Sequence, residues 1–161
     1  MLKSLKVIGF LVVAAAVPSY AQAQTCTNVS GRLFERVLPN NAAPNDQLGR
    51  VLGVVSGSLV GAKTAIITSD PRRNPISTID TFGSDRGLIV LNGSAVFTPM
   101  GVAPGGPVVL YDDLNMTVSL GTGEFLGATG SIRATGFGID VSPGQGQFIL
   151  EYSGRICVPT K

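Results

Sequence analysis

The sequence predicts an all-β protein whose strands form an eight-stranded antiparallel barrel. After Cys26, no stretch of ten or more residues shows an apolar repeat at helical spacing. Short strand-like segments recur at regular intervals between turns rich in Gly and Pro, a pattern typical of a sandwich or an up-and-down barrel. Residues 120–138 contain six glycines, which favours the barrel, because glycines within strands mark the bulges and bends where a sheet curls.

Eight strands are expected along the chain. We place them at 27–38, about 48–56, about 59–68, 76–82, 86–98, 108–120, 123–138 and 146–158. In the last of these, Phe148, Leu150 and Tyr152 alternate with polar residues, so one face of the strand is buried and the other is wet. The alternation alone leaves open which face lies inside the barrel.

The glycine-rich stretch is expected to be one strongly bent strand. Its structural glycines are Gly121, Gly123, Gly127 and Gly130. We expect at least one of Gly127 and Gly130 to lie at a bulge or to have a positive φ, where any other residue is strained.

The first 23 residues have the pattern of a secretory signal peptide. Lys3 and Lys6 form a positive segment, an apolar run follows at 7–17, and Ala21-Gln22-Ala23 matches a cleavage site. The alternative is a membrane anchor, but the apolar run is shorter than the roughly 20 residues that a spanning helix needs. The sequence therefore predicts a secreted or periplasmic protein with a single domain at 24–161 and no membrane contact after cleavage.

The charge of the chain indicates no polyanionic partner. It has 12 Lys and Arg against 10 Asp and Glu, and two of the lysines lie in the signal segment. Binding to nucleic acid or to an anionic membrane surface requires clustered cations, which the sequence lacks. We therefore expect no nucleic-acid partner.

The two cysteines, Cys26 and Cys157, lie near opposite ends of the predicted domain. In an oxidising compartment, a disulfide that joins the first strand to the last is the natural interpretation. A lipid-modified Cys26 is the alternative, but Thr25 does not match the small residue that usually precedes a lipidated cysteine.

Histidine is absent from the whole chain. Its absence removes the usual general base near neutral pH and the commonest ligand of transition metals. With both cysteines paired, we expect no metal site and no cofactor. The chemistry that remains open to a barrel cavity uses a carboxylate, an arginine and a phenol, and our candidate catalytic set is Glu35, Arg133 and Tyr152. The alternative is that these residues form cross-strand ion pairs and a tyrosine tip at the barrel rim.

The segment GTGEFLGATGSIRATG at 121–136, followed by GQFILEYSGRI at 146–156, resembles the closing strands of the allene oxide cyclase barrel, whose architecture is shared by plant dirigent proteins. The resemblance covers residues 78–156 and implies an eight-stranded barrel. Glu35 followed by Pro44 also resembles the cyclases, but Val37 stands where they have asparagine, and Leu126 and Thr129 stand where dirigent proteins have arginines.

The resemblance implies a secreted barrel that binds a small apolar ligand in its cavity and steers its cyclisation or isomerisation by shape. An enzyme of this kind would be a cofactor-independent cyclase or isomerase, which selects one folded conformer of a reactive substrate. The alternative is a non-catalytic extracellular structural or interaction module whose barrel is filled by its own side chains. Association into a homo-oligomer is compatible with either function.

Overall fold

The computed structural model describes residues 23–38, 49–70, 73–104, 106–139 and 146–160. Residues 1–22 of the predicted signal segment (1–23) and Pro44 lie outside the described residues. No helix in the described part of the chain is long and apolar enough to cross a membrane.

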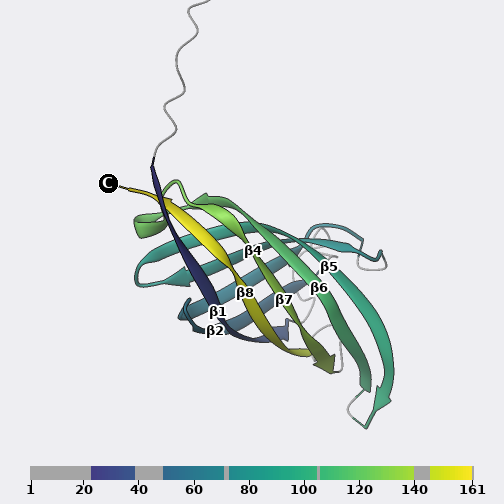
Figure 1. Cartoon of the computed structure of the whole chain (residues 1–161). Coiled ribbons are helices and arrows are strands. Elements are labelled where there is room, and N and C mark those ends of the chain that lie inside the picture. Colours follow the sequence, from purple (N-terminus) through teal and green to yellow (C-terminus); the bar gives the residue numbers. More distant parts are fainter. Residues whose placement is uncertain (1–22, 39–48, 71–72, 105, 140–145, 161) are drawn as a thin grey trace, which may run out of the picture.

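Eight antiparallel strands form a closed barrel, which confirms the predicted fold class (Figure 1). Each strand pairs with the next one in sequence, and β8 pairs with β1 to close the ring. The strands are β1 (Gln24–Val37), β2 (Arg50–Gly57), β3 (Gly61–Ile67), β4 (Ile76–Ser84), β5 (Gly87–Ala103), β6 (Gly106–Gly121), β7 (Thr129–Ile139) and β8 (Gln147–Pro159).

The glycine-rich stretch is not one bent strand, so that expectation is wrong. β6 ends at Gly121, a short 3-10 turn η1 (Gly123–Phe125) follows, and β7 begins at Thr129. Gly123 and Gly127 have φ values of 61° and 73°, which turn the chain back on itself between the two strands. Gly130, inside β7, also has a positive φ of 126°.

Because consecutive strands run in opposite directions, the connections between them lie alternately at the two ends of the barrel. The two ends of the described chain lie together with the β2–β3 and β4–β5 turns and with η1, and we call this the terminal end. β5 and β6 form the longest hairpin, which extends beyond the other strands at the opposite end (Figure 1).

Alternate residues of every strand point into the barrel and form one core. In β8 the inward residues include Phe148, Leu150 and Tyr152, so the apolar face that the sequence identified is the inner one. Leu33, Leu91, Met116 and Leu150 are all fully buried. The middle of the barrel is therefore packed with side chains.

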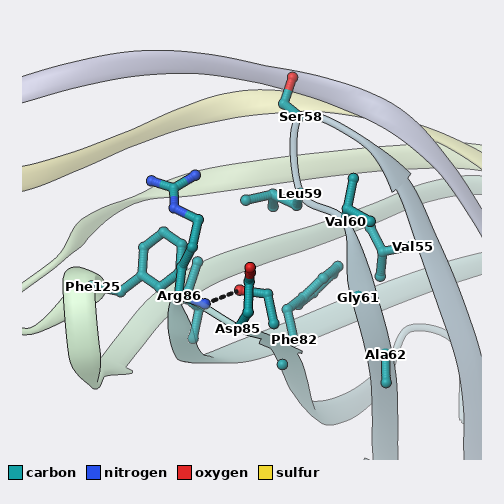
Figure 2. A pocket seen from close by; sticks show the side chains of 13 residues that line it. Val55, Ser58, Leu59, Val60, Gly61, Ala62, Phe82, Asp85, Arg86 and Phe125 are labelled. Atoms are coloured by element: carbon teal, nitrogen blue, oxygen red, sulfur yellow. Dashed lines mark hydrogen bonds between the residues drawn. The ribbon is translucent and has the colours of Figure 1, made fainter.

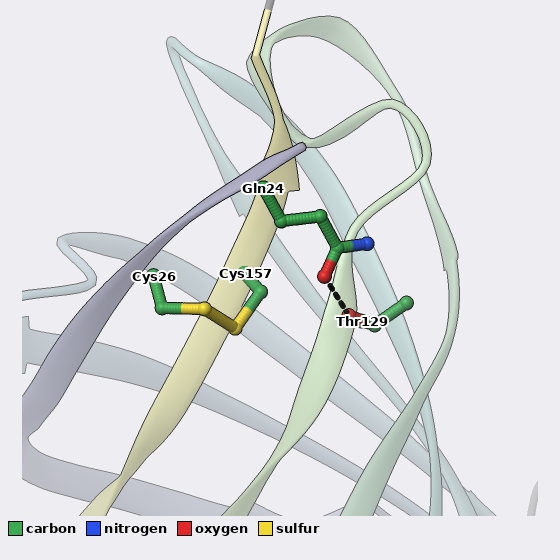
Figure 3. Close-up of a disulfide and its surroundings, with 4 residues drawn as sticks. All are labelled: Gln24, Cys26, Thr129 and Cys157. Carbon is green, nitrogen blue, oxygen red and sulfur yellow. Dashed lines mark hydrogen bonds between the residues drawn. A yellow bond between two sulfur atoms is a disulfide. The ribbon is translucent and has the colours of Figure 1, made fainter. Parts of the chain in front are cut away.

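The seam between β1 and β8 is closed covalently. Cys26 lies directly opposite Cys157 in the strand register, and the two sulfurs are bonded, as the sequence predicts. Beside them the Thr129 hydroxyl of β7 donates a hydrogen bond of 3.2 Å to Gln24 Oε1 of β1 (Figure 3). This contact joins β1 to β7 across the intervening strand β8.

Candidate functional site

A buried cluster of charged side chains lies inside the barrel. Lys63 of β3 places its Nζ 2.5 Å from Glu35 Oε1 of β1 and 2.7 Å from Asp80 Oδ1 of β4. All three side chains are at most 3% exposed. Buried charges are costly unless they are paired, and here one ammonium serves two carboxylates.

The strand register explains how residues from separate strands meet. Glu35 is opposite Gly53 of β2, and Gly53 is in turn opposite Lys63, so β2 lies between the two charges. A Cβ added at Gly53 would lie 2.9 Å from the Glu35 Cγ and closer still to the Phe34 carbonyl. The missing side chain of Gly53 gives Glu35 the space to reach Lys63 across the strand.

A second glycine makes room on the other side of the cluster. The Thr78 hydroxyl donates a hydrogen bond of 2.5 Å to Asp80 Oδ2, and Gly93 of β5 is opposite Thr78. A Cβ at Gly93 would collide with Thr78 Oγ1 and would lie 2.6 Å from Asp80 Oδ2. The cluster thus occupies a space between two glycines within an otherwise apolar interior.

The electrostatics of the cluster keep Lys63 charged. Burial by itself lowers the pKa of the Lys63 ammonium, but the charges of Glu35 and Asp80, together with their hydrogen bonds, raise it above its usual value of 10.5. Because a nucleophilic lysine must lose its proton, this side chain is a fixed cation and not an amine nucleophile.

Tyr152, the second predicted catalytic residue, is engaged in a structural contact. Its hydroxyl accepts a hydrogen bond of 3.0 Å from the Leu59 N–H and donates one of 3.0 Å to the Ser56 carbonyl. Burial raises the pKa of Tyr152 above 10.0, and the bond from the Leu59 backbone opposes part of that shift. The phenol fastens the β2–β3 turn to β8.

Arg133, the third predicted residue, lies on the outer face of β7. It forms an ion pair of 2.6 Å with Asp113 of β6, and its side chain is 62% exposed. The structure therefore brings Glu35 together with Lys63 and Asp80, and it does not bring Glu35 together with Arg133. Tyr152 has its own hydroxyl partners, on β2 and on the β2–β3 turn.

A cavity of about 160 Å³ opens at the terminal end, and we call it the mouth cavity (Figure 2). Its apolar side chains come from the ends of strands β2 to β5, from the β2–β3 turn and from η1, and the β4–β5 turn contributes charged ones. The lining residues are Val55, Ser58, Leu59, Val60, Gly61, Ala62, Phe82, Gly83, Ser84, Asp85, Arg86, Ile89 and Phe125.

Charged side chains lie at the rim of the mouth cavity. Arg86 Nε donates a hydrogen bond of 2.6 Å to Glu124 Oε2, and its guanidinium lies 5.2 Å from the centre of the Phe125 ring. Both charged side chains are more than half exposed, so the pair contributes little to stability. Figure 2 shows the Arg86 side chain beside the Phe125 ring.

Phe82 relates the mouth cavity to the buried cluster. It lines the cavity, and the centre of its ring is 5.9 Å from Lys63 Nζ. Glu35, Lys63 and Asp80 do not line the cavity. Phe82 therefore belongs to the cavity wall and also contacts the cluster.

Sequence reasoning identified Glu35 but missed Lys63 as its partner. The available signal was the alternation of side chains along a strand: Lys63 lies on the same side of β3 as Gly61, Ala65 and Ile67. Asp80 likewise shares its parity with Ile76 and Phe82. Among the described residues, no group of three or more His, Cys, Asp or Glu could hold a metal ion.

Comparison with known proteins gives little further information. No protein-family model matches the chain, and no curated protein matches it. One solved structure that is similar is the pterocarpan synthase dirigent protein GePTS1, with a TM-score of 0.34 and 15% sequence identity. The match covers 86% of this chain and 93% of that one.

Proposed function

We propose that the protein binds one small, ring-sized apolar molecule in the mouth cavity and holds it in a fixed orientation. The observation that supports this is the cavity itself, which lies at one end of a closed barrel and is walled by Leu59, Phe82, Ile89 and Phe125. Ligand sites are typically apolar hollows with a few polar groups, and here the polar groups are at the rim.

The cavity volume limits the size of the ligand. Drug-sized ligands occupy sites of roughly 300–1,000 Å³, whereas an apolar cavity of about 150 Å³ accommodates benzene. At about 160 Å³, the mouth cavity encloses a single ring with small substituents. A long-chain fatty acid would leave most of its surface in water, so we favour monocyclic phenols or terpenoids.

Steering of a cyclisation or isomerisation at this site would rest on shape and on the exclusion of water. Glu35, Arg133 and Tyr152 are all absent from the cavity wall. Among the described residues of the wall, the titratable groups are the carboxylate of Asp85 and the guanidinium of Arg86. Binding and conformational selection are therefore better supported than acid–base catalysis.

A second candidate function is that of a non-catalytic structural module. The packed middle of the barrel favours this function. Four of its inward side chains have no exposed surface, namely Leu33, Leu91, Met116 and Leu150. The ion cluster adds three more side chains to the same interior. A module of this kind would bind no small molecule at its mouth.

A cavity-filling variant distinguishes the two functions. Val55→Phe adds a ring to an inward residue of the cavity wall, whereas Val54→Phe adds the same ring to the outer face of the same strand. We expect the native protein to bind an environment-sensitive apolar dye at one site and a monocyclic phenol to displace it. Val55→Phe should abolish dye binding and Val54→Phe should preserve it. Dye binding that Val55→Phe leaves unchanged would contradict the proposal.

We also propose that the protein is exported to an oxidising compartment. The signal-like pattern at 1–23 and the Cys26–Cys157 disulfide support this. Mass spectrometry of the protein from its native host should find a chain that begins at Gln24. An intact N-terminus and free thiols in cytoplasmic material would contradict export.

A further inference from the structure

One carboxylate at the rim of the mouth cavity is available to a ligand. Asp85 lines the cavity, and its side chain forms no ion pair or hydrogen bond with another residue in the described part of the chain. The neighbouring cation, Arg86, already has a partner, because its Nε donates a hydrogen bond of 2.6 Å to Glu124 Oε2. In Figure 2, Asp85 lies between the Arg86 and Phe82 side chains. A ligand in the cavity can therefore reach the Asp85 carboxylate without displacing an existing contact.

The β4–β5 turn that carries Asp85 is held in place on two sides. Ser84 and Gly87 are register partners, so Asp85 and Arg86 are the two residues of a tight hairpin loop. Within the loop, the Arg86 N–H donates a hydrogen bond of 3.1 Å to Ser84 Oγ. The Arg86 carbonyl in turn accepts a hydrogen bond of 2.9 Å from the Glu124 N–H of η1. A loop that is fixed in this way loses little freedom when a ligand binds to it.

The formal charge around the mouth cavity is negative. At the rim, the carboxylates of Asp85 and Glu124 outnumber the guanidinium of Arg86. Behind the wall, the centre of the Phe82 ring is 5.9 Å from Lys63 Nζ, and that one ammonium is shared by two buried carboxylates. Charges behind an apolar wall are screened less than charges in water. The rim and the interior thus both favour a positively charged ligand over a negatively charged one.

We infer that the mouth cavity selects a single-ring ligand that carries an amine. This inference rests on the proposed function, in which the volume of the cavity limits the ligand to one ring, and it specifies the polar group on that ring. The ring lies against Phe82 and Phe125 of the wall, and the ammonium donates a hydrogen bond to the Asp85 carboxylate.

The exposure of Asp85 makes this position suitable for a charged group. An ammonium at the rim keeps part of its water, so it avoids the large cost of burying a charge. A hydrogen bond between two charged groups is about twice as strong as one between neutral groups. A phenol or an alcohol can donate to the same carboxylate without carrying a charge itself, so it should bind at the same place more weakly.

Three single-ring probes of similar size test the inference. At neutral pH, benzylamine is a cation, benzyl alcohol is neutral and benzoate is an anion. In isothermal titration calorimetry at low salt, benzylamine should bind about tenfold more tightly than benzyl alcohol, and benzoate should bind most weakly. Added salt should reduce the preference for the amine, because Asp85 is exposed. Benzyl alcohol or benzoate that binds as tightly as benzylamine would overturn the inference.

Two variants that each remove one negative charge show whether Asp85 is responsible. Asp85→Asn should weaken benzylamine binding about tenfold and benzyl alcohol binding by less, because an amide oxygen still accepts a hydrogen bond. The control is Glu151→Gln, on the outer face of β8, where the carboxylate pairs with Arg32 at 3.2 Å. This control should keep the preference for the amine. An equal loss of the preference in both variants would overturn the role of Asp85.

The Val55→Phe variant separates failure of this inference from failure of the proposed function. If the probes bind in the mouth cavity, Val55→Phe should abolish the binding of all three, and circular dichroism checks that the variant is folded. Binding that Val55→Phe abolishes but that shows no preference for benzylamine overturns the amine inference and leaves the proposed function standing. A native protein that binds neither the dye nor any of the three probes contradicts both.

Discussion

The ammonium of Lys63 lies 2.5 Å from a carboxylate oxygen of Glu35, although β1 and β3 are not neighbours in the sheet. The two side chains meet inside the barrel over Gly53, and the same ammonium contacts Asp80 at 2.7 Å. Three strands are thus linked through one nitrogen atom, in an interior where an uncompensated charge is expensive.

Removal of Lys63 should therefore be strongly destabilising. Lys63→Met keeps most of the side-chain volume but leaves two buried carboxylates without their cation, at a cost of about 3–5 kcal/mol. Urea midpoints measure the loss. The control is the triple variant Lys63→Met, Glu35→Gln, Asp80→Asn. It carries none of these three charges and should recover much of the lost stability. A Lys63→Met protein as stable as wild type would mean that the cluster contributes nothing.

Stability should fall at alkaline pH. The pKa values of Lys63 and Tyr152 are raised above 10.5 and 10.0 in the folded protein, so the folded state holds these protons more tightly than the unfolded chain. The stabilisation is complete below those unfolded values and is lost as pH rises through the folded ones. Urea midpoints measured across this range should decline. Tyr152→Phe should reduce the decline by removing one of the two groups, and a flat profile in wild type would contradict the assignment.

Gly130 should tolerate a side chain less well than Gly127. Both have positive φ, so alanine is strained at either position by about 1–2 kcal/mol. At Gly130 the new Cβ also meets the Arg155 carbonyl, which belongs to the paired strand, whereas at Gly127 it meets the Pro159 ring at 2.9 Å. Urea midpoints should rank Gly130→Ala below Gly127→Ala, with the exposed Ser131→Ala close to wild type. The reverse ranking would show that the backbone of β8 yields more easily than the proline ring.

Loss of the disulfide should destabilise the barrel without changing its fold. Cys26 and Cys157 are 131 residues apart, and for a loop of this length the chain-entropy model gives roughly 4–5 kcal/mol as an upper value. The Cys26→Ser, Cys157→Ser variant should unfold at lower urea with an unchanged circular dichroism spectrum. Thiol titration of the denatured, unreduced protein should find no free thiol, and two free thiols would disprove the bond.

Much of the fold follows from the sequence because strand periodicity and turn residues are local signals. The alternation in β8 identified its buried face. The two cysteines of the chain predicted the disulfide that joins β1 to β8. The break at Gly123–Phe125 was missed, because a glycine-rich segment is equally compatible with a bent strand and with a turn between strands. Deciding between them requires the pairing partners.

The candidate site was less predictable, because it depends on which faces point inward and on which strands lie across the barrel from each other. Glu35 was identified from a resemblance, but Lys63 is recognisable as buried only once the parity of β3 is fixed by its pairing with β2 and β4. The mouth cavity is formed by the ends of four strands, two turns and η1, whose relative positions no local pattern specifies.

The order of the strands has a consequence for how the barrel forms. Seven of the eight strand pairings join consecutive segments, and each requires only a hairpin to close. The pairing of β1 with β8 joins segments at opposite ends of the chain, and the entropy of closing so long a loop makes it the slowest contact to gain. We expect an open, curled sheet to form first and the β1–β8 seam to close last, so the Cys26–Cys157 bond locks the final step of folding.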